Sequence, residues 1–227
     1  SAWLKEQGVH IGGDLPDNPA IAIIAVKPQM MADALPDVKV LGNGQTLVIS
    51  IAAGTPIATF EAMLGEKTPI VRAMPNTPAA VGRGITALIG NTNVTPDDMD
   101  LAEGLLLSFG QTVRLDNEGQ MDAVTAVSGS GPAYVFHLIE ALAAAGEAEG
   151  LPADLAMQLA KATVGGAGEL AEDVDETPTQ LRINVTSPNG TTQAALEVLM
   201  DSETGFPPLL RRAVAAAANR SRELSNE

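Results

Sequence analysis

The sequence contains no cysteine, and it has few histidine, aromatic and basic residues. Without cysteine the chain has no disulfide, no thiolate metal ligand and no cysteine nucleophile. Its two histidines, His10 and His137, lie far apart in sequence with no evident ligand partner, so we expect no metal site. Only 13 lysine and arginine residues oppose 28 aspartate and glutamate residues. The resulting formal charge of −15 argues against nucleic acid and anionic membranes as partners, because both would be repelled.

Long hydrophobic runs are also missing, since the apolar stretch Ala213–Ala218 is too short to cross a membrane. No signal peptide is evident, so we expect a cytoplasmic protein. The length of 227 residues allows one large or two modest domains, and a hydrophobic content of 45% is enough to bury a core. Aromatic residues make up 3% of the chain, so we expect its helices to pack closely through small side chains.

Residues 1–116 alternate strand and helix signals, which predicts a parallel, doubly wound α/β domain. Short apolar, β-branched runs are typical of strands buried on both faces. Strands are expected over residues 20–26, 46–51, 69–74, 84–89 and 112–115, and helices over residues 28–38, 56–64 and 96–109.

Residues 117–227 lose the strand signal, which predicts an all-helical second domain. Helices are expected over residues 121–127, 132–149, 152–173, 177–184, 191–200 and 207–224. Glycines 165, 166 and 168 are costly inside a helix unless another backbone approaches closely. Together with the alanine-rich run 141–145, they indicate helix–helix packing, either within one subunit or between subunits.

Three of the expected strands end in loops of unusual composition. The first leads into a lysine and a proline (25–28), the second into small residues (50–55), and the third into two prolines that flank Asn76 and Thr77. Ordinary turns also have such compositions. Because ligands of parallel sheets bind beyond the carboxyl ends of the strands, three such loops in succession favour a cofactor crevice.

The Gly-x-Gly-x-x-Gly turn that normally opens a dinucleotide-binding fold does not occur in the sequence. The segment Ser-Gly-Ser-Gly-Pro-Ala-Tyr (128–134) lacks the third glycine and leads into helices. We interpret it as a tight bend that passes close to cofactor or substrate.

Hydroxyl, asparagine and glycine residues gather over residues 181–192, immediately before an apolar-periodic run. A helix begins here, and the free N–H groups of a helix start attract anions. The hydroxyls of Thr186, Ser187, Thr191 and Thr192 could orient such an anion. An ordinary helix cap is the alternative, but the density of the cluster favours a small-anion site.

Five segments together resemble the pyrroline-5-carboxylate reductase family. They are AVKP (25–28), SIAAG (50–54), RAMPNTP (72–78), DAVTAVSGSGPAY (122–134) and NVTSPNGTT (184–192). The resemblance extends from about residue 8 to residue 224. It implies the last step of proline biosynthesis, in which NADPH, or less favourably NADH, reduces the cyclic imine 1-pyrroline-5-carboxylate. It also implies an incomplete Rossmann domain over 1–116 and a helical substrate and dimerisation domain over 117–227. Subunits of the family dimerise through that helical domain and often assemble further.

The resemblance assigns roles to individual residues. The implied cofactor-binding residues are Ala25, Val26, Lys27, Pro28, Ala52, Ala53, Pro75, Asn76 and Thr77. The implied substrate-binding residues are Ser187, Asn189, Gly190, Thr191 and Thr192. Backbone amides of the turn 189–192 would hold the substrate carboxylate, and the Thr192 hydroxyl would act in catalysis by hydrogen-bonding the imine nitrogen. Such chemistry needs positioning more than a strong acid, which agrees with the lack of an obvious histidine or lysine catalyst.

The sequence departs from the family pattern in three places. The first strand and glycine-rich turn of the family are absent from the 227 residues, so we expect a fragment or a processed chain whose sheet has unpaired edges and binds dinucleotide poorly. Asn189 replaces a usual glycine, and asparagine tolerates positive φ, so the turn can survive. Ile183 stands where a charged residue is common.

Two other functions remain open on the sequence. One is a non-catalytic helical oligomerisation module, which nucleotide binding would exclude. The other is a two-domain reductase of a different small imino or keto acid. The Ser-Pro-Asn-Gly-Thr-Thr turn (187–192) without a catalytic lysine favours the imine.

Overall fold

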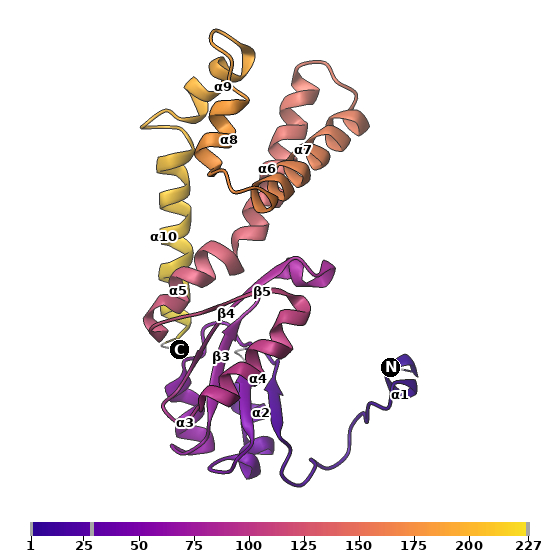
Figure 1. Cartoon of the computed structure of the whole chain (residues 1–227), viewed down its shortest axis with the longest axis vertical. Helices are drawn as coiled ribbons and strands as arrows, with labels where there is room; N and C mark the ends of the chain where they lie inside the picture. Colours follow the sequence, from indigo (N-terminus) through magenta and orange to yellow (C-terminus); the bar gives the residue numbers. More distant parts are fainter. Residues whose placement is uncertain (1, 28–29, 226–227) are drawn as a thin grey trace. The chain divides into compact units, whose positions relative to one another are not determined.

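The computed structural model describes residues 2–27 and 30–225, which pack into two compact units (Figure 1). The first unit comprises residues 1–121 and 222–227, and the second unit comprises residues 122–221. The boundary between the two units lies after residue 121, slightly later than the predicted boundary after residue 116. The last residues of the chain belong to the first unit. The assignment of cofactor and substrate roles to 1–116 and 117–227 stays a prediction.

The first unit contains five strands and four α-helices among the described residues. They are α1 (Ala2–Glu6), β1 (Ile21–Ile24), α2 (Met31–Val38), β2 (Leu47–Ser50), α3 (Ile57–Leu64), β3 (Ile70–Met74), β4 (Gly84–Gly90), α4 (Pro96–Leu106) and β5 (Gly110–Arg114). Short 3-10 turns are η2 (Lys39–Leu41), η3 (Thr77–Val81), η4 (Leu107–Phe109) and η5 (Glu118–Gln120). All five predicted strands are present, and the predicted helix over 28–38 begins at Met31 in the described residues. Helix α1 lies outside the helices predicted above.

The strands form one sheet in the order β1-β2-β3-β4-β5. Strands β1, β2 and β3 are parallel, β4 is antiparallel to β3, and β5 is parallel to β4. The sheet is therefore mostly parallel, as predicted, with β3 and β4 as its one antiparallel pair among the described residues. A parallel connection needs a crossover of a dozen or more residues. The link between β3 and β4 holds only the short turn η3, so β4 must run back beside β3.

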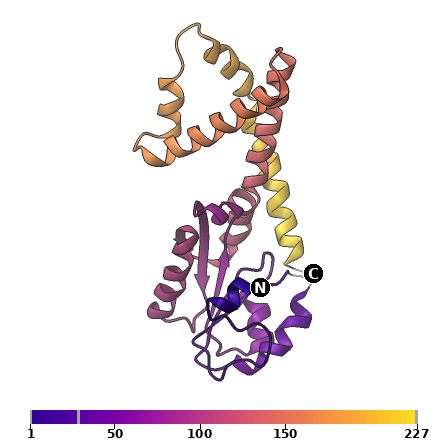
Figure 2. The ribbon, with the colours of Figure 1, turned by 90° about the vertical axis from the view of Figure 1, so that its right-hand side faces the viewer.

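Helices cover both faces of the sheet (Figures 1 and 2). Alternate residues of β2 separate two cores, because successive strand side chains point to opposite faces. Val48 packs with α2 and α3, whereas Leu47 and Ile49 pack with α4. Phe60 of α3 and Ala102 of α4 are fully buried in these two layers. The parallel, two-sided burial explains why β2 reads as a continuous apolar run.

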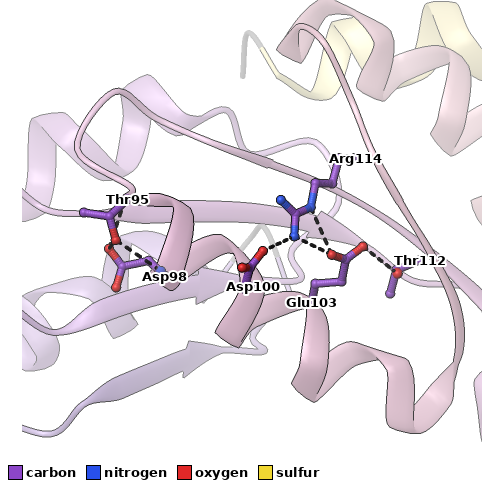
Figure 3. A network of polar contacts seen from close by, with 6 residues as sticks. All are labelled: Thr95, Asp98, Asp100, Glu103, Thr112 and Arg114. Carbon is purple, nitrogen blue, oxygen red and sulfur yellow. Dashed lines mark hydrogen bonds and ion pairs between the residues drawn. The ribbon is translucent and has the colours of Figure 1, made fainter.

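An ion-pair cluster joins α4 to the edge strand β5 (Figure 3). Arg114 of β5 donates to Asp100 and Glu103 of α4, with an Nε–Oε2 distance of 3.0 Å to Glu103. The Thr112 hydroxyl donates to Glu103 over 2.8 Å. These hydrogen bonds, that of Arg114 first, lower the pKa of the Glu103 carboxyl. At the start of the same helix, Thr95 and Asp98 form a capping box.

The second unit is built from helices, and residues 122–221, all of which the structure describes, contain no strand. After α5 (Met121–Val124) and a π-helical turn, η6 (Thr125–Gly129), the chain continues through α6 (Gly131–Ala148), α7 (Ala153–Asp173), α8 (Pro178–Asn184), α9 (Thr191–Leu199) and α10 (Phe206–Leu224). Within the described residues no helix is long and apolar enough to cross a membrane.

The bend predicted over residues 128–134 is wider and shorter than expected, because a π-helical turn ends at Gly129 and α6 already begins at Gly131. Its approach to cofactor or substrate stays a prediction. In this wider turn the Ser130 amide donates to the carbonyl of Thr125 over 2.8 Å. The Tyr134 hydroxyl donates to the carbonyl of Ala126 over 3.0 Å. Tyr134 thus satisfies a carbonyl of the irregular turn, and such turns are frequent at functional sites.

Helices α6 and α7 lie side by side (Figures 1 and 2). Ala143, Ala156 and Ala160 form their buried core, as expected from the scarcity of aromatic residues. The glycines of α7 behave differently. A Cβ added at Gly165, Gly166 or Gly168 would meet no described atom within 4 Å beyond the helix itself. Packing within one subunit therefore does not explain these glycines, and packing between subunits stays a prediction.

Candidate functional site

The carboxyl ends of β1, β2 and β3 lie together at one edge of the sheet in the first unit. Ile24 of β1 aligns with Ser50 of β2, which aligns with Arg72 of β3. The three predicted cofactor loops therefore leave the sheet side by side, as expected for parallel strands. We call this the loop edge of the sheet.

The first loop follows Ile24. Ala25 and Lys27 are exposed, and Val26 is half-buried against the core between the sheet and α2 and α3. The Lys27 cation therefore lies at the loop edge and is open to solvent. The predicted cofactor contact Pro28 lies outside the described residues.

The second loop follows Ser50 and leads into α3. The Ala52 amide is within 3.3 Å of the buried Ser50 hydroxyl, and Ala52 itself is buried. Ala53 is half-buried. Gly54 has a φ of +74°, a conformation that glycine adopts without strain. Gly54 is also buried, and a Cβ added there would lie 3.2 Å from Leu224 Cβ, whereas Ala53 is partly exposed. Contact of this loop with a flat ligand therefore stays a prediction.

The third loop follows Met74 and continues into η3. Pro75 and Asn76 are half-buried, and Thr77 is exposed. Asn76 Oδ1 accepts a hydrogen bond from the Ile85 amide of β4 over 3.0 Å. The Asn76 side chain thus fastens the loop to the neighbouring strand, and direct contact with a cofactor carboxamide stays a prediction.

A charged pair beneath these loops was missed in the sequence. Arg72 lies in the middle of β3, only 4% exposed, and its Nη1 is 2.7 Å from Glu118 Oε1. The signal was available, because an arginine within a buried strand requires a buried acceptor. The identity of that acceptor, 46 residues away, could not be read from the pattern.

The predicted substrate residues lie together in the second unit, in the turn between α8 and α9 and in the first two residues of α9. Ser187, Asn189 and Thr191 are exposed, whereas Gly190 and Thr192 are half-buried. Gly190 is the N-cap of α9, and no side chain caps this helix start. The Thr186 hydroxyl donates to the carbonyl of Arg182 over 2.6 Å, so it serves α8 instead of orienting a ligand.

Two of the amides expected to hold a carboxylate already have partners. The Asn189 amide donates to Gln193 Oε1 over 2.8 Å, and the Gly190 amide donates to the Ser187 carbonyl over 3.0 Å. The first amides of α9, which begin at Thr191, have no intrahelical acceptor. The binding of a carboxylate by these amides stays a prediction. The role of Gln193 was not foreseen.

Backbone geometry explains the residue types of this turn. Asn189 has a φ of +58°, which confirms that asparagine supports the turn in place of glycine. A Cβ added at Gly190 would lie 2.3 Å from Ser187 Oγ. Gly190 is therefore required for the close approach of the Ser187 side chain.

Comparison with known proteins identifies the family. The pyrroline-5-carboxylate reductase of Pseudomonas aeruginosa is 42% identical to this chain over 207 residues, which are 91% of this chain and 75% of that protein. The chain belongs to the pyrroline-5-carboxylate reductase family. A family model for pyrroline-5-carboxylate reductase dimerisation matches residues 118–224.

Solved pyrroline-5-carboxylate reductases share the fold. The Coxiella burnetii enzyme superimposes with a TM-score of 0.89 at 38% identity, covering 98% of this chain and 83% of that one. The Plasmodium falciparum enzyme, solved with NADP bound, has a TM-score of 0.81 at 35% identity and covers 91% of this chain and 77% of that one. The Rossmann-like sheet followed by a helical dimerisation domain is therefore the fold of this family.

Proposed function

We propose that this chain reduces the cyclic imine 1-pyrroline-5-carboxylate to L-proline, the last step of proline biosynthesis. The observation that carries the proposal is the membership of the family, at 42% identity over 91% of the chain. NAD(P)H is the reductant, and when bound it supplies a hydride to the imine carbon, while the ring nitrogen takes up one proton from solvent. A cytoplasmic location stays a prediction from the sequence.

The residues at the loop edge fit a dinucleotide. Ala52 and Ala53 have small side chains, and Ala53 is partly exposed, which supports close approach of a flat ligand. We propose that Ala25, Val26, Lys27 and Pro28 flank it on one side. The loop Pro75–Thr77, braced by Asn76, closes the other side, where the nicotinamide would lie.

The turn between α8 and α9 fits an imino acid. We propose that the amides at the start of α9 bind the substrate carboxylate, with the Ser187 and Thr191 hydroxyls beside them. The turn Asn189–Gly190 positions these amides and hydroxyls. We propose that the half-buried Thr192 hydroxyl hydrogen-bonds the ring nitrogen and so orients the imine carbon for hydride transfer.

We further propose a homodimer formed through the helical unit. Large apolar side chains are exposed along α6 and α7 in this chain, including Phe136, Leu142 and Leu159. The open glycine face of α7 lies on one of the same helices. Exposed apolar surface of this kind marks an interface, and it agrees with the dimerisation model that matches residues 118–224.

The activity is tested by NADPH oxidation on addition of 1-pyrroline-5-carboxylate, with L-proline identified by mass spectrometry. Thr192→Val removes the proposed hydrogen bond and should lower kcat about 10- to 100-fold, whereas Thr192→Ser keeps the hydroxyl and most of the rate. Equal rates for wild type and Thr192→Val would contradict the role of Thr192.

The same assay separates the other two functions. Turnover of a different imino or keto acid in preference to 1-pyrroline-5-carboxylate would favour a related reductase. A chain that assembles yet neither binds nor oxidises NADPH would be an oligomerisation module.

A further inference from the structure

One carboxylate oxygen joins two elements of the first unit. Glu118 Oε1 accepts from Arg72 Nη1 of β3 over 2.7 Å and from the backbone amide of Ile57 over 2.8 Å. The side chain of Arg72 is 5% exposed and that of Glu118 is 31% exposed. A buried guanidinium needs a negatively charged partner. Because the Arg72 side chain is buried, the surrounding atoms hold it in place, and Glu118 must come to it.

The second donor, Ile57, is the first residue of α3. Its N-cap, Pro56, makes no side-chain capping hydrogen bond. Glu118 therefore supplies the cap from 61 residues further along the chain, and its negative charge is favourable at a helix start.

Both elements carry cofactor loops. Ala52 and Ala53 lie just before Ile57 in the connection from β2 to α3, and the loop Pro75–Thr77 begins just after Arg72 and Met74 in β3. Because the same atom receives both donors, a displacement of one loop is transmitted to the other.

We infer that Glu118 is a positioning residue whose carboxylate holds the loops 52–56 and 75–77 at a fixed spacing and thereby sets the affinity for the dinucleotide. The statement about affinity rests on the proposed function, whereas the statement about loop spacing does not.

The test compares Glu118→Ala, Glu118→Gln and Glu103→Ala. Glu103 is the matched control, because it also joins an arginine of a strand to a helix of the first unit, but the two elements are β5 and α4, which carry neither loop (Figure 3). Hydrogen exchange without nucleotide is followed in peptides that cover 52–57 and 72–77. KM for NADPH, KM for the imino acid and kcat are then measured.

In Glu118→Ala we expect faster exchange in both loops and a KM for NADPH raised at least about tenfold, with kcat at saturating NADPH less affected. Glu118→Gln keeps the oxygen acceptor, so its exchange rates and its KM for NADPH should be close to those of the wild type. Glu103→Ala should change neither.

The inference would be overturned if both loops of Glu118→Ala exchanged hydrogen at the wild-type rate. It would also be overturned if Glu103→Ala accelerated exchange in these loops as much as Glu118→Ala does. An unchanged KM for NADPH in Glu118→Ala would overturn the part about affinity. If the wild-type chain does not use NADPH, the proposed function fails, and the exchange experiment still decides whether Glu118 holds the loops. If Glu118→Ala does not fold, Arg72→Met is added to remove the unpaired guanidinium, and the same measurements are made on the double variant.

Discussion

At the scale of single residues, the substrate turn depends on the difference between two neighbours. Asn189 adopts a positive φ that several residue types tolerate poorly, while Gly190 has an ordinary φ of −86°, but a Cβ added there would displace the Ser187 hydroxyl. Position 189 therefore favours residues that tolerate a positive φ, whereas position 190 favours glycine because it has no Cβ. A Cβ at position 190 would also lie 3.1 Å from the Ser187 carbonyl oxygen.

Gly190→Ala should therefore shift the turn and raise the KM for the imino acid about tenfold or more, with little change in the KM for NADPH. Asn189→Gly is the matched control, since glycine adopts the same φ without strain and should leave both constants near the wild-type values. Steady-state kinetics on the three proteins check this. A normal KM in Gly190→Ala would show that Ser187 can move aside at no cost to substrate binding.

At the scale of elements, the attachment of β5 to α4 should depend on pH. Arg114 lowers the pKa of Glu103, and the Thr112 hydroxyl adds to the effect. A carboxyl with a lowered pKa in the folded state stabilises the fold above its unfolded pKa, about 4.5, and this contribution is lost as pH falls through the lower folded value. Wild type should therefore be more stable than Glu103→Gln at neutral pH.

Denaturant midpoints of the two proteins, measured from neutral to acidic pH, check this expectation. The difference between them should shrink as pH falls below about 4.5. A difference that stays constant over this range would mean that the Glu103 charge contributes nothing to stability.

The elements themselves were largely predictable, because buried parallel strands and helices have distinct periodicities. The direction of β4 could also have been deduced, since the link from Met74 to Gly84 is too short for a crossover. The π-helical turn could not, because Ser-Gly-Ser-Gly has the composition of a bend and only the contact of Tyr134 with Ala126 shows how the wide turn is stabilised.

The sequence predicted which residues gather in the candidate site, but it did not predict the hydrogen bonds that these residues form. Composition and resemblance placed the loops at the ends of β1, β2 and β3, and placed the substrate turn at the start of α9. They could not reveal that Asn76 Oδ1 and the Asn189 amide are engaged within the fold, or that Glu118 pairs with Arg72. Such pairings depend on tertiary geometry over long sequence separations.

At the scale of the whole molecule, the glycines of α7 provide a test of assembly. A Cβ added at Gly166 would meet no described atom within 4 Å beyond its own helix, so we expect the subunit itself to tolerate leucine there. If another subunit packs closely there, Gly166→Leu should shift the protein from dimer or larger assembly to monomer, as measured by sedimentation or light scattering.

Gly104→Leu in α4 is the matched control, because Gly104 is also a helical glycine with open space around its Cα. It should leave the assembly unchanged and add about 0.5–1 kcal/mol of stability through helix propensity. If Gly166→Leu gave the same result, the glycine face of α7 would be open to solvent in the assembled protein.

The reversal of direction between β3 and β4 has an electrostatic consequence. Helices α2 and α3 follow the parallel strands and start at the loop edge, whereas α4 follows β4 and ends there. Their dipoles therefore oppose one another, with partial positive charge beside β1 and β2 and partial negative charge beside β5. In a chain of net charge −15, this gradient gives the loop edge a polarity of its own. Phosphate groups are favoured over the first strands, and the positively charged ring of an oxidised nicotinamide is favoured towards β4.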